Sequence, residues 1–483
     1  MLHLSGKMLQ YQKQGMISFH TPGHKGKEEF FKDLHFPEQD LTELPGLDML
    51  HSPQGVIDEA QKRAAEVYQS DSSFFLVNGA TVGNQGMLMT LASIGMQEVG
   101  LVQAKVLVER QSHRSVMSGL VLSGLEPEYI PGIIHPEFRL PLGLMPVDVA
   151  MDEVLGIHLT YPSYYGSLPD LGKIIAQRDE KAPRKRILVD QAHGAHYLNP
   201  LFPPGALELG ADMVLHSTHK TLSALTQGAM LHVKGPRITL SAVKRALELL
   251  QSSSPSYLLM ASLERAVEYA LDSTRWERLY EAVQELHDCV GGSLRLLNPR
   301  DIGTYGITQL DWSKILVNTR ELGISAQACV EHLRKNYGID PELWDEENIL
   351  FLLGIGNTPE EIKILTEGLL SLEELRKKIT LGEGCLLKQG QAEDPTLLIG
   401  EMPLPTRRLT PRQAYFAKKR QIPLRDSVGK ILGESISPYP PGIPLIVMGE
   451  EMNCDILELL TRHQGRWQGW EDSGRGVWVI EEV

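Results

Sequence analysis

Short apolar runs alternate with segments of helical periodicity between about residues 55 and 235. The runs are rich in β-branched residues, and the alternation is typical of a mostly parallel β-sheet with helices on both faces. Ligands of such sheets bind beyond the carboxyl ends of the strands. We therefore expect an α/β fold with its functional site at that edge. The expected strands lie at 74–77, 106–108, 156–159, 187–189, 213–215 and 228–233, and the expected helices at 56–68 and 83–94.

The rest of the chain predicts further helices and two smaller units. Segments 237–250 and 257–271 have helical patterns. After about residue 300 the pattern of apolar runs and helical segments changes. Segments 309–317 and 349–353 predict strands of a small α/β domain. A linker containing three prolines precedes a predicted helix at 412–420, and the proline-rich stretch 439–444 must be extended because each proline restricts its predecessor. The predicted domains are 1–300, 301–386 and 387–483.

Length and composition exclude several classes of protein. A chain of 483 residues is too long for one ordinary core. The 42% hydrophobic and 22% charged content suits a soluble globular protein, and the net charge of -14 argues against a nucleic-acid partner. Since no apolar stretch approaches the roughly 20 residues needed to cross a bilayer, no membrane partner is expected. Four widely separated cysteines suit a reducing compartment, so we expect a cytoplasmic protein.

Two of the expected strands lead into a lysine and an aspartate. The strand at 213–215 runs into His216-Ser217-Thr218-His219-Lys220, and the strand at 187–189 ends at Asp190. Enzymes that use pyridoxal phosphate (PLP) hold their cofactor with such a pair. The lysine amine forms a Schiff base with the aldehyde, and the carboxylate keeps the ring nitrogen protonated. We therefore predict PLP as the cofactor, with Lys220 at its aldehyde and Asp190 at its ring nitrogen.

Other residues near strand ends fit the same cofactor. Ala192 is small enough to let a flat ring lie against the backbone. The turn Asn78-Gly79-Ala80-Thr81 opens a predicted helix, so its backbone N–H groups suit a phosphate. A hydroxyl and an imidazole beside the lysine, those of Ser217 and His219, could bind the phosphate as well. His113 offers an aromatic face that could stack on a cofactor ring.

Two rival functions use the same part of the sequence. Two histidine pairs and a carboxylate could ligate a metal in a metal-dependent hydrolase: His193/His196, His216/His219 and Asp190. That function leaves Lys220 and the turn at 78–81 without a role, so no metal site is expected. The second rival is a binding or regulatory protein that uses the pocket without catalysis.

Ordered motifs across nearly the whole chain resemble the Orn/Lys/Arg decarboxylase family, PLP enzymes of aspartate-aminotransferase fold (fold type I) that decarboxylate basic amino acids. The most specific motifs are the segment at 217–220 and the segment Tyr439-Pro440-Pro441-Gly442-Ile443-Pro444 followed by Gly449-Glu450. The other motifs, in order, are 21–26, 48–55, 78–79, the His113 segment and 190–193.

The resemblance implies a role for each candidate residue. Lys220 would be the Schiff-base lysine and Asp190 the partner of the pyridine nitrogen, with His113 stacked on one ring face and Ala192 against the other. The family builds its active site across a dimer interface, and the turn at 252–255 would bring Ser253 to the neighbouring subunit's phosphate. The remaining cofactor contacts implied by the resemblance are Ala80, Thr81, His193, Ser217 and His219.

The resemblance predicts the reaction and leaves some of its details open. The expected function is decarboxylation of arginine, lysine or ornithine to agmatine, cadaverine or putrescine in polyamine metabolism. Arginine and lysine are favoured as substrates because compact family members commonly act on them. Glu342 is the candidate partner for the cationic side chain of the substrate. Three groups could protonate the substrate's Cα: Lys220, His219 and His193.

The sequence also departs from the family pattern. Gln111 and Arg114 flank the stacking histidine where Asn and Lys are usual, and Met448 stands where a proline commonly precedes the closing Gly-Glu. The chain has no room for the extra N-terminal domain of large enterobacterial members, which favours the compact form. The alternative within PLP chemistry is an aminotransferase or a Cβ–S lyase, for which Arg320 or Arg334 could clamp the substrate carboxylate.

Overall fold

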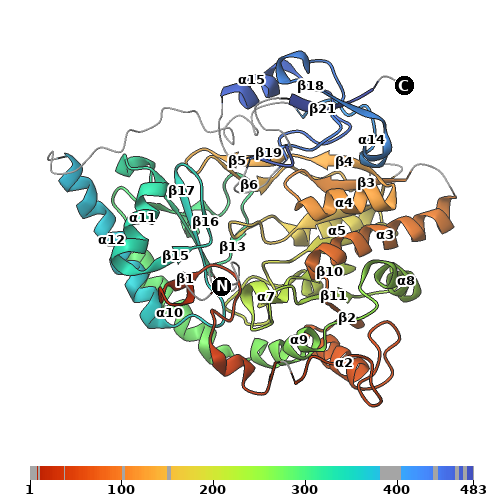
Figure 1. The fold of residues 1–483 in the computed structure, drawn as a ribbon, viewed down its shortest axis with the longest axis horizontal. Coiled ribbons are helices and arrows are strands. Elements are labelled where there is room, and N and C mark those ends of the chain that lie inside the picture. The colour runs from red at the N-terminus through yellow and green to blue at the C-terminus, as the bar shows by residue number, and fades with distance from the viewer. Residues whose placement is uncertain are drawn as a thin grey trace.

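A seven-stranded sheet forms the centre of the computed structural model (Figure 1). The structure describes residues 8, 11–36, 38–100, 104–149, 154–380, 404–438, 444–462, 467–470 and 476–481. The strand order is β2-β11-β10-β9-β7-β3-β4, and only β11 runs antiparallel to its neighbours. The predicted mostly parallel α/β sheet is therefore confirmed. The strands are β2 (Ser72–Leu76), β3 (Lys105–Glu109), β4 (Glu126–Ile130), β7 (Val154–Thr160), β9 (Arg186–Asp190), β10 (Met213–His216) and β11 (Ala229–Val233).

Helices cover both faces of this sheet because successive strand residues point to opposite sides. Leu188 and Met213 pack with α3 (Gly79–Val99), α4 (Arg114–Ser123) and α8 (Leu240–Leu250). Val189 and Val214 pack on the other face, with α2 (Val56–Tyr68), α5 (Leu171–Lys181), α6 (Ala206–Leu209) and α9 (Tyr257–Ala270). The helix expected at 83–94 is longer at both ends, and the one expected at 237–250 begins at Leu240.

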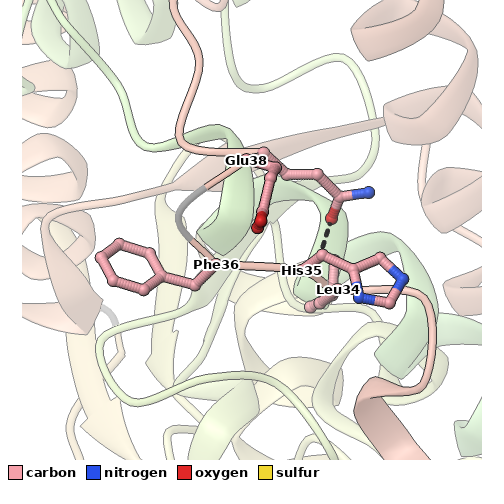
Figure 2. Close-up of a pocket in the computed structure, with 5 residues that line it drawn as sticks. Leu34, His35, Phe36 and Glu38 are labelled. Carbon is pink, nitrogen blue, oxygen red and sulfur yellow. Dashed lines mark hydrogen bonds between the residues drawn. The ribbon is translucent and has the colours of Figure 1, made fainter.

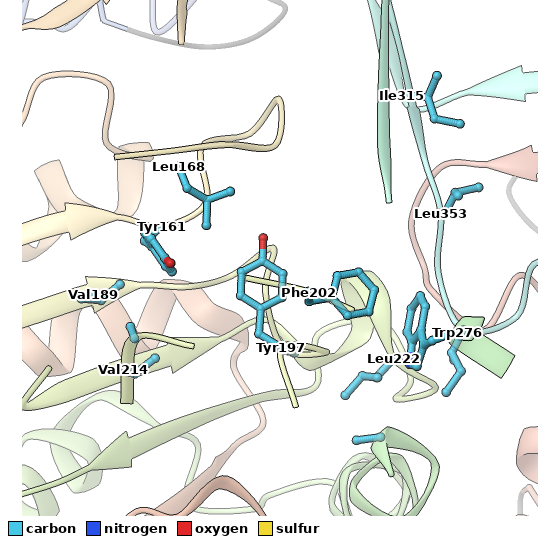
Figure 3. Close-up of a cluster of buried hydrophobic side chains, with 14 of the residues drawn as sticks. Tyr161, Leu168, Val189, Tyr197, Phe202, Val214, Leu222, Trp276, Ile315 and Leu353 are labelled. Carbon is cyan, nitrogen blue, oxygen red and sulfur yellow. The ribbon is translucent and has the colours of Figure 1, made fainter. Parts of the chain in front are cut away.

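One apolar core continues from the central sheet into the second unit. Figure 3 shows Val189 and Val214 beside the sheet, Phe202 and Trp276 between the layers, and Ile315 on the far side. The Phe202 ring stacks on Trp312 with centroids 4.6 Å apart, and Trp276 stacks on His196 at 5.1 Å. Aromatic side chains thus join the central sheet to the second unit.

A four-stranded antiparallel sheet of order β12-β14-β17-β16 forms the second unit. Its strands are β12 (Arg295–Leu296), β14 (Lys314–Asn318), β16 (Leu343–Trp344) and β17 (Asn348–Leu352), and its helices are α10 (Ser273–Cys289), α11 (Ala326–Tyr337) and α12 (Pro359–Thr380). The N-terminal strand β1 (Ile17–Phe19) pairs with β15 (Ile339–Pro341) in parallel. A two-stranded sheet of β5 (Gly132–His135) and β6 (Leu140–Leu144) lies between β4 and β7 in the sequence.

The single strand predicted at 309–317 is wrong. The structure has β13 (Gln309–Leu310), paired with β8 (Ser167–Leu168), and then β14 in a different sheet. The break lies at Asp311, whose carboxylate accepts a hydrogen bond from the backbone N–H of Ser313 at 2.9 Å. This local turn interrupts the strand and redirects the chain.

The C-terminal part of the chain, drawn in blue, lies at the top of Figure 1. It contains α14 (Pro411–Phe416), β18 (Lys419–Pro423), β19 (Ser437–Pro438), α15 (Cys454–Arg462), β20 (Trp467–Gln468) and β21 (Gly476–Ile480). The helix predicted at 412–420 is wrong after Phe416, because Ala417 is extended and β18 pairs with β21. Residues 439–443 of the proline-rich stretch lie outside the described residues, and the predicted domain boundaries stay a prediction.

Candidate functional site

Lys220 lies on α7 (Thr218–Thr221), one short turn past the carboxyl end of β10. Its Nζ is 2.9 Å from Nε2 of His193, which follows the neighbouring strand β9. The same nitrogen is 5.9 Å from the centroid of the Tyr164 ring. The Tyr164 ring meets the His193 ring edge to face, with centroids 4.6 Å apart. The lysine amine therefore lies between an imidazole and a phenol, at the sheet edge predicted from the sequence.

Asp190 ends β9 and is buried, with 4% of its surface exposed. Its register partner on β10 is Leu215, so it lies one strand away from the segment that carries Lys220. The carboxylate accepts hydrogen bonds from the Asn84 side-chain amide at 2.7 Å and from the Ala192 N–H at 3.1 Å. Both contacts hold the carboxylate in place at the carboxyl end of β9.

Asn84 connects Asp190 to His113, although these two residues come from different strands. The Asn84 amide also donates to the Ser115 hydroxyl at 2.9 Å, and that hydroxyl is 2.8 Å from Nδ1 of His113. The Ser115 N–H donates to the same Nδ1, so His113 caps helix α4. The oxygen of Asn84 is 3.0 Å from Nε2 of His158, which fixes the orientation of the amide.

The predicted phosphate contacts lie on three neighbouring segments. Asn78 ends the loop before α3 and accepts a hydrogen bond from the Ser252 N–H at 3.1 Å, while Gln227 donates to the Val77 carbonyl at 2.7 Å. Next to Gln227, Gly228 accepts from the His219 N–H at 3.2 Å. These contacts bring together the first turn of α3 with Ala80 and Thr81, the Ser217–His219 segment and the turn that carries Ser253.

Ser253 and Thr81 are exposed in the single chain. The turn of Ser253 contacts Asn78 of the same chain through Ser252. The expected reach of Ser253 to a neighbouring subunit therefore stays a prediction.

Glu342 lies near Lys220, just before β16 of the four-stranded sheet. One carboxylate oxygen accepts a hydrogen bond from the Tyr164 hydroxyl at 2.7 Å, and the other accepts from the Thr21 N–H at 2.7 Å. The negative charge of Glu342 is close enough to raise the pKa of Lys220, against the larger effect of burial. A half-buried carboxylate thus faces the lysine across Tyr164.

The N-terminal motif at 21–26 lies between α7 and the four-stranded sheet of the second unit. The Gly23 N–H donates to the His219 carbonyl at 2.7 Å, and the Gly23 carbonyl accepts from the Gly356 N–H at 3.0 Å. A Cβ at Gly23 would lie 2.5 Å from the backbone carbon of Thr221, so only glycine fits. Lys25 donates to the Leu352 carbonyl at 2.9 Å and ties the motif to β17. This motif therefore holds the Lys220 turn against the second unit.

Burial lowers the pKa of the basic groups in the site. The pKa of Lys220 is lowered by burial and by the charge of Lys314, while Asp190 and Glu342 act in the opposite direction. Burial and the charge of Lys220 hold the pKa of His193 well below its usual range. Burial lowers the pKa of His219 to about 4. The pKa of His113 is lowered as well, first by desolvation and then by Lys220. The imidazoles are therefore neutral near pH 7.

Members of both histidine pairs of the hydrolase hypothesis have other partners in the structure. His196 lies 3.5 Å from the Asp311 carboxylate, and His216 is hydrogen-bonded within 3.1 Å to His232 and 3.0 Å to Gln191. Among the described residues, no group of three or more histidines, cysteines or carboxylates is placed to hold a metal ion. The hydrolase hypothesis has no support in this part of the chain.

The two arginines offered for an aminotransferase are bound to carboxylates. Arg320 Nε donates to Glu347 at 3.1 Å, and Arg334 Nε donates to Asp340 at 2.8 Å. Arg334 also stacks over the Trp344 ring. Each would have to leave an ion pair before it could clamp a substrate.

A hollow of about 550 Å³ on the N-terminal segment lies outside this site (Figure 2). Its lining is Leu34, His35, Phe36, Glu38 and Gln39, and the Gln39 side chain accepts from the His35 N–H at 2.9 Å. None of these residues contacts a candidate cofactor residue through a hydrogen bond found in the described part of the chain. No helix in the portion of the chain that the structure describes is long and apolar enough to cross a membrane.

Three residues of the site were missed by the sequence interpretation. Asn84 lies inside a predicted helix, Tyr164 in a loop after β7, and Lys314 inside what was predicted as a continuous strand. Asn84 and Tyr164 are far in sequence from the residues they contact, whereas Lys314 contacts the nearby Asp311 as well as the distant His193. Only Asn84 had a usable signal, because a polar side chain in the apolar helix α3 must find a buried partner.

Comparison with known proteins agrees with this geometry. Residues 4–291 match the family "Orn/Lys/Arg decarboxylase, major domain", and residues 400–482 match "Orn/Lys/Arg decarboxylase, C-terminal domain". The chain belongs to the Orn/Lys/Arg decarboxylase family. An arginine decarboxylase of Halalkalibacterium halodurans is 31% identical over 98% of this chain and 96% of its own length. The resemblance stated from the motifs is confirmed.

Solved structures show the same fold at low sequence identity. A lysine decarboxylase of Francisella novicida superposes with a TM-score of 0.75 at 18% identity, over 98% of this chain and 80% of that one. A high-resolution structure of SPT with PLP superposes with a TM-score of 0.53 at 15% identity, over 75% of this chain and 87% of that one. The predicted PLP-dependent transferase fold is confirmed, as is the predicted class of enzyme at the level of the family.

Proposed function

We propose that this protein decarboxylates arginine or lysine with PLP held at Lys220. The observation that supports this most strongly is the position of Lys220 Nζ, which lies 2.9 Å from Nε2 of His193 on the turn that follows β10, the strand next to Asp190. Family membership supports the decarboxylation of a basic amino acid, and ornithine is the third candidate substrate.

The residues at the sheet edge fit PLP. Asp190 is buried and held by its two hydrogen bonds, so its carboxylate would be placed to pair with a protonated ring nitrogen. Ala192 leaves room for a ring, and His113 is held by Ser115, which Asn84 connects to Asp190. When bound, PLP would supply an electron sink for the bond to the departing carboxylate.

The phosphate would lie at the first turn of α3. The Asn78 side chain is turned to Ser252 and not to this turn, so the first N–H groups of the helix remain for an anion. Thr81, Ser217 and His219 would add side-chain contacts. With its pKa lowered to about 4, His219 is neutral and would donate or accept a single hydrogen bond there.

The substrate would lie between Lys220 and the small sheet. The Glu342 carboxylate would pair with the cationic end of the side chain, because Tyr164 and Thr21 hold it toward the site. Lys220 Nζ would donate a hydrogen bond to the neutral His193 Nε2, which lies 2.9 Å away and would orient the amine. His193 and Tyr164 would cover the amine and limit the access of water.

Decarboxylation can be tested with three amino acids. The purified protein reconstituted with PLP should release carbon dioxide from L-arginine or L-lysine, and Lys220→Ala should lower turnover by at least about 10³-fold. Lys173→Ala, an exposed lysine on α5, is the matched control and should keep full activity. A keto acid product instead of carbon dioxide would favour the aminotransferase, and turnover by Lys220→Ala near the control would refute the assignment.

The assembly and location belong to the same proposal. We infer a cytoplasmic homodimer with active sites shared between subunits, in which Ser253 contacts the partner's phosphate site. A mass measurement in solution, together with loss of PLP affinity in Ser253→Ala, tests this arrangement. A monomer that binds PLP with full affinity would contradict it.

A further inference from the structure

Two fully buried charged residues adjoin the Lys220 amine and are given no role in the function proposed above. Asp311 and Lys314 both have 0% exposed side chains, and Lys314 begins strand β14 of the small sheet. Lys314 Nζ donates to the Asp311 carboxylate and to the backbone carbonyl of His193, the latter at 3.0 Å. A charged group of the second unit thus contacts the loop whose imidazole touches Lys220.

Asp311 is held by several donors and fixes the position of Lys314. Its carboxylate accepts from the Ser313 hydroxyl at 2.6 Å and from the Tyr197 hydroxyl at 2.9 Å. Although burial opposes it, the charges of Lys314 and His196 hold the pKa of Asp311 well below its usual range. The carboxylate is therefore ionised and favours the charged form of Lys314, against burial, which lowers the pKa of that lysine. A buried ion pair is a weak source of stability, so its contacts with the site are more informative than its energy.

The aliphatic part of Lys314 supports a second loop of the site. Gly166 has a φ of +91°, and a Cβ there would lie 2.9 Å from Cβ of Lys314. The Gly166 carbonyl accepts from the Asp311 N–H at 2.8 Å. Gly166 closes the turn that carries Tyr164, the other residue beside the Lys220 amine. Lys314 consequently contacts both loops that flank this amine.

We propose that Lys314, held by Asp311, is a positioning residue that sets the geometry and the local charge around the Lys220 amine. Lys314 fixes the His193 loop by donating a hydrogen bond to the His193 carbonyl. Its aliphatic side chain packs against Gly166 in the turn that carries Tyr164. Its positive charge also acts against the charged form of the amine. A neighbouring cation favours the neutral, nucleophilic form of a lysine. The proposal rests on the proposed function in that Lys220 is the reactive lysine, but its test needs neither cofactor nor turnover.

Several charged and titratable groups act on Lys220 besides Lys314. Asp190 from β9 and Glu342 from the small sheet raise its pKa, and Lys314 lowers it. His193, His113 and His219 also face it, each with a pKa that the lysine charge helps to lower. Removing the Lys314 charge while leaving these groups intact should raise the pKa of Lys220.

The test is the pH dependence of Lys220 labelling in the cofactor-free protein. Reductive methylation with formaldehyde and cyanoborohydride, read by mass spectrometry of the Lys220 peptide, gives the midpoint for the wild type and for Lys314→Met. The variant should shift the midpoint upward by about half a pH unit or more. Amide exchange at residues 191–197 should become at least about threefold faster, because the carbonyl contact is lost. An unchanged midpoint in folded Lys314→Met overturns the proposal.

Two further variants make the result specific. Lys335→Met, an exposed lysine on α11 of the same unit, is the matched control and should leave the midpoint unchanged. Should Lys314→Met fail to fold because it leaves Asp311 unpaired, the double variant Lys314→Met/Asp311→Asn removes both charges. The double variant must also raise the midpoint, and a midpoint at the wild-type value overturns the proposal. Loss of PLP binding alone would not mimic either result, since PLP is absent.

Discussion

Glu109 offers a sharp test of how burial controls charge near the site. It ends strand β3 with 8% of its surface exposed, and its carboxylate accepts a hydrogen bond from the Thr160 N–H at 2.8 Å. Burial, with a smaller contribution from the charge of Asp190, raises the pKa of Glu109 from 4.5 to about 7. The perturbation is Glu109→Gln, which keeps an acceptor for Thr160 and cannot ionise.

The expected magnitude follows from the shift in pKa. Because the folded pKa is raised above the unfolded value, the stabilisation is fully present below about pH 4.5 and is lost as the pH rises through about 7. The 2.5-unit difference between these values corresponds to about 3 kcal/mol of unfolding free energy. For a chain of 483 residues this is about 3 °C in Tm.

Thermal unfolding of the cofactor-free protein at pH 5 and pH 9 measures this effect. Glu109→Gln and the wild type should melt within about 1 °C of each other at pH 5, and the variant should melt about 3 °C higher at pH 9. Glu248→Gln, on the exposed face of α8, is the matched control and should show the same difference at both pH values. A Tm difference for Glu109→Gln that does not change with pH would refute the reasoning.

Three further substitutions test other parts of the structure. Glu450→Ala should lower the unfolding free energy by about 3–5 kcal/mol in urea titrations. The reason is that the buried Arg110, which donates to Glu450 at 2.7 and 2.9 Å, would lose its counter-ion. A loss below about 1 kcal/mol would contradict this. Glu342→Gln should lower kcat/KM for the basic amino acid by roughly 10–100-fold with little change in Tm, and equal kcat/KM in steady-state assays would remove Glu342 from the substrate site. Asp48→Ala should cost about 1–2 kcal/mol, since its carboxylate accepts N–H groups at the start of α2, and an unchanged melting curve would show that the cap is dispensable.

The sequence predicted what depends on local pattern. The strands that carry Asp190 and precede Lys220 were found because short apolar runs between helices are distinctive. Their adjacency in the sheet then follows from the fold class. Glu342, proposed only from the resemblance, does lie near Lys220, held by Tyr164.

What the sequence could not predict depends on contacts between distant segments. The Asn84 amide donates hydrogen bonds to both Asp190 and Ser115, and Asp190 lies 106 residues further along the chain. No local sequence pattern encodes a contact at that distance. The strand predicted through Asp311 failed because a side-chain to backbone hydrogen bond broke it. The helix predicted past Phe416 failed because pairing with β21 outweighed helical propensity.

The central claim of this account is a covalent bond between Lys220 Nζ and PLP. Borohydride reduction of the purified holoprotein, followed by peptide mass spectrometry, tests it directly. The account predicts one phosphopyridoxyl group per chain, located on the peptide that contains Lys220. The same label on another lysine, or none at all in a protein that decarboxylates amino acids, would contradict it.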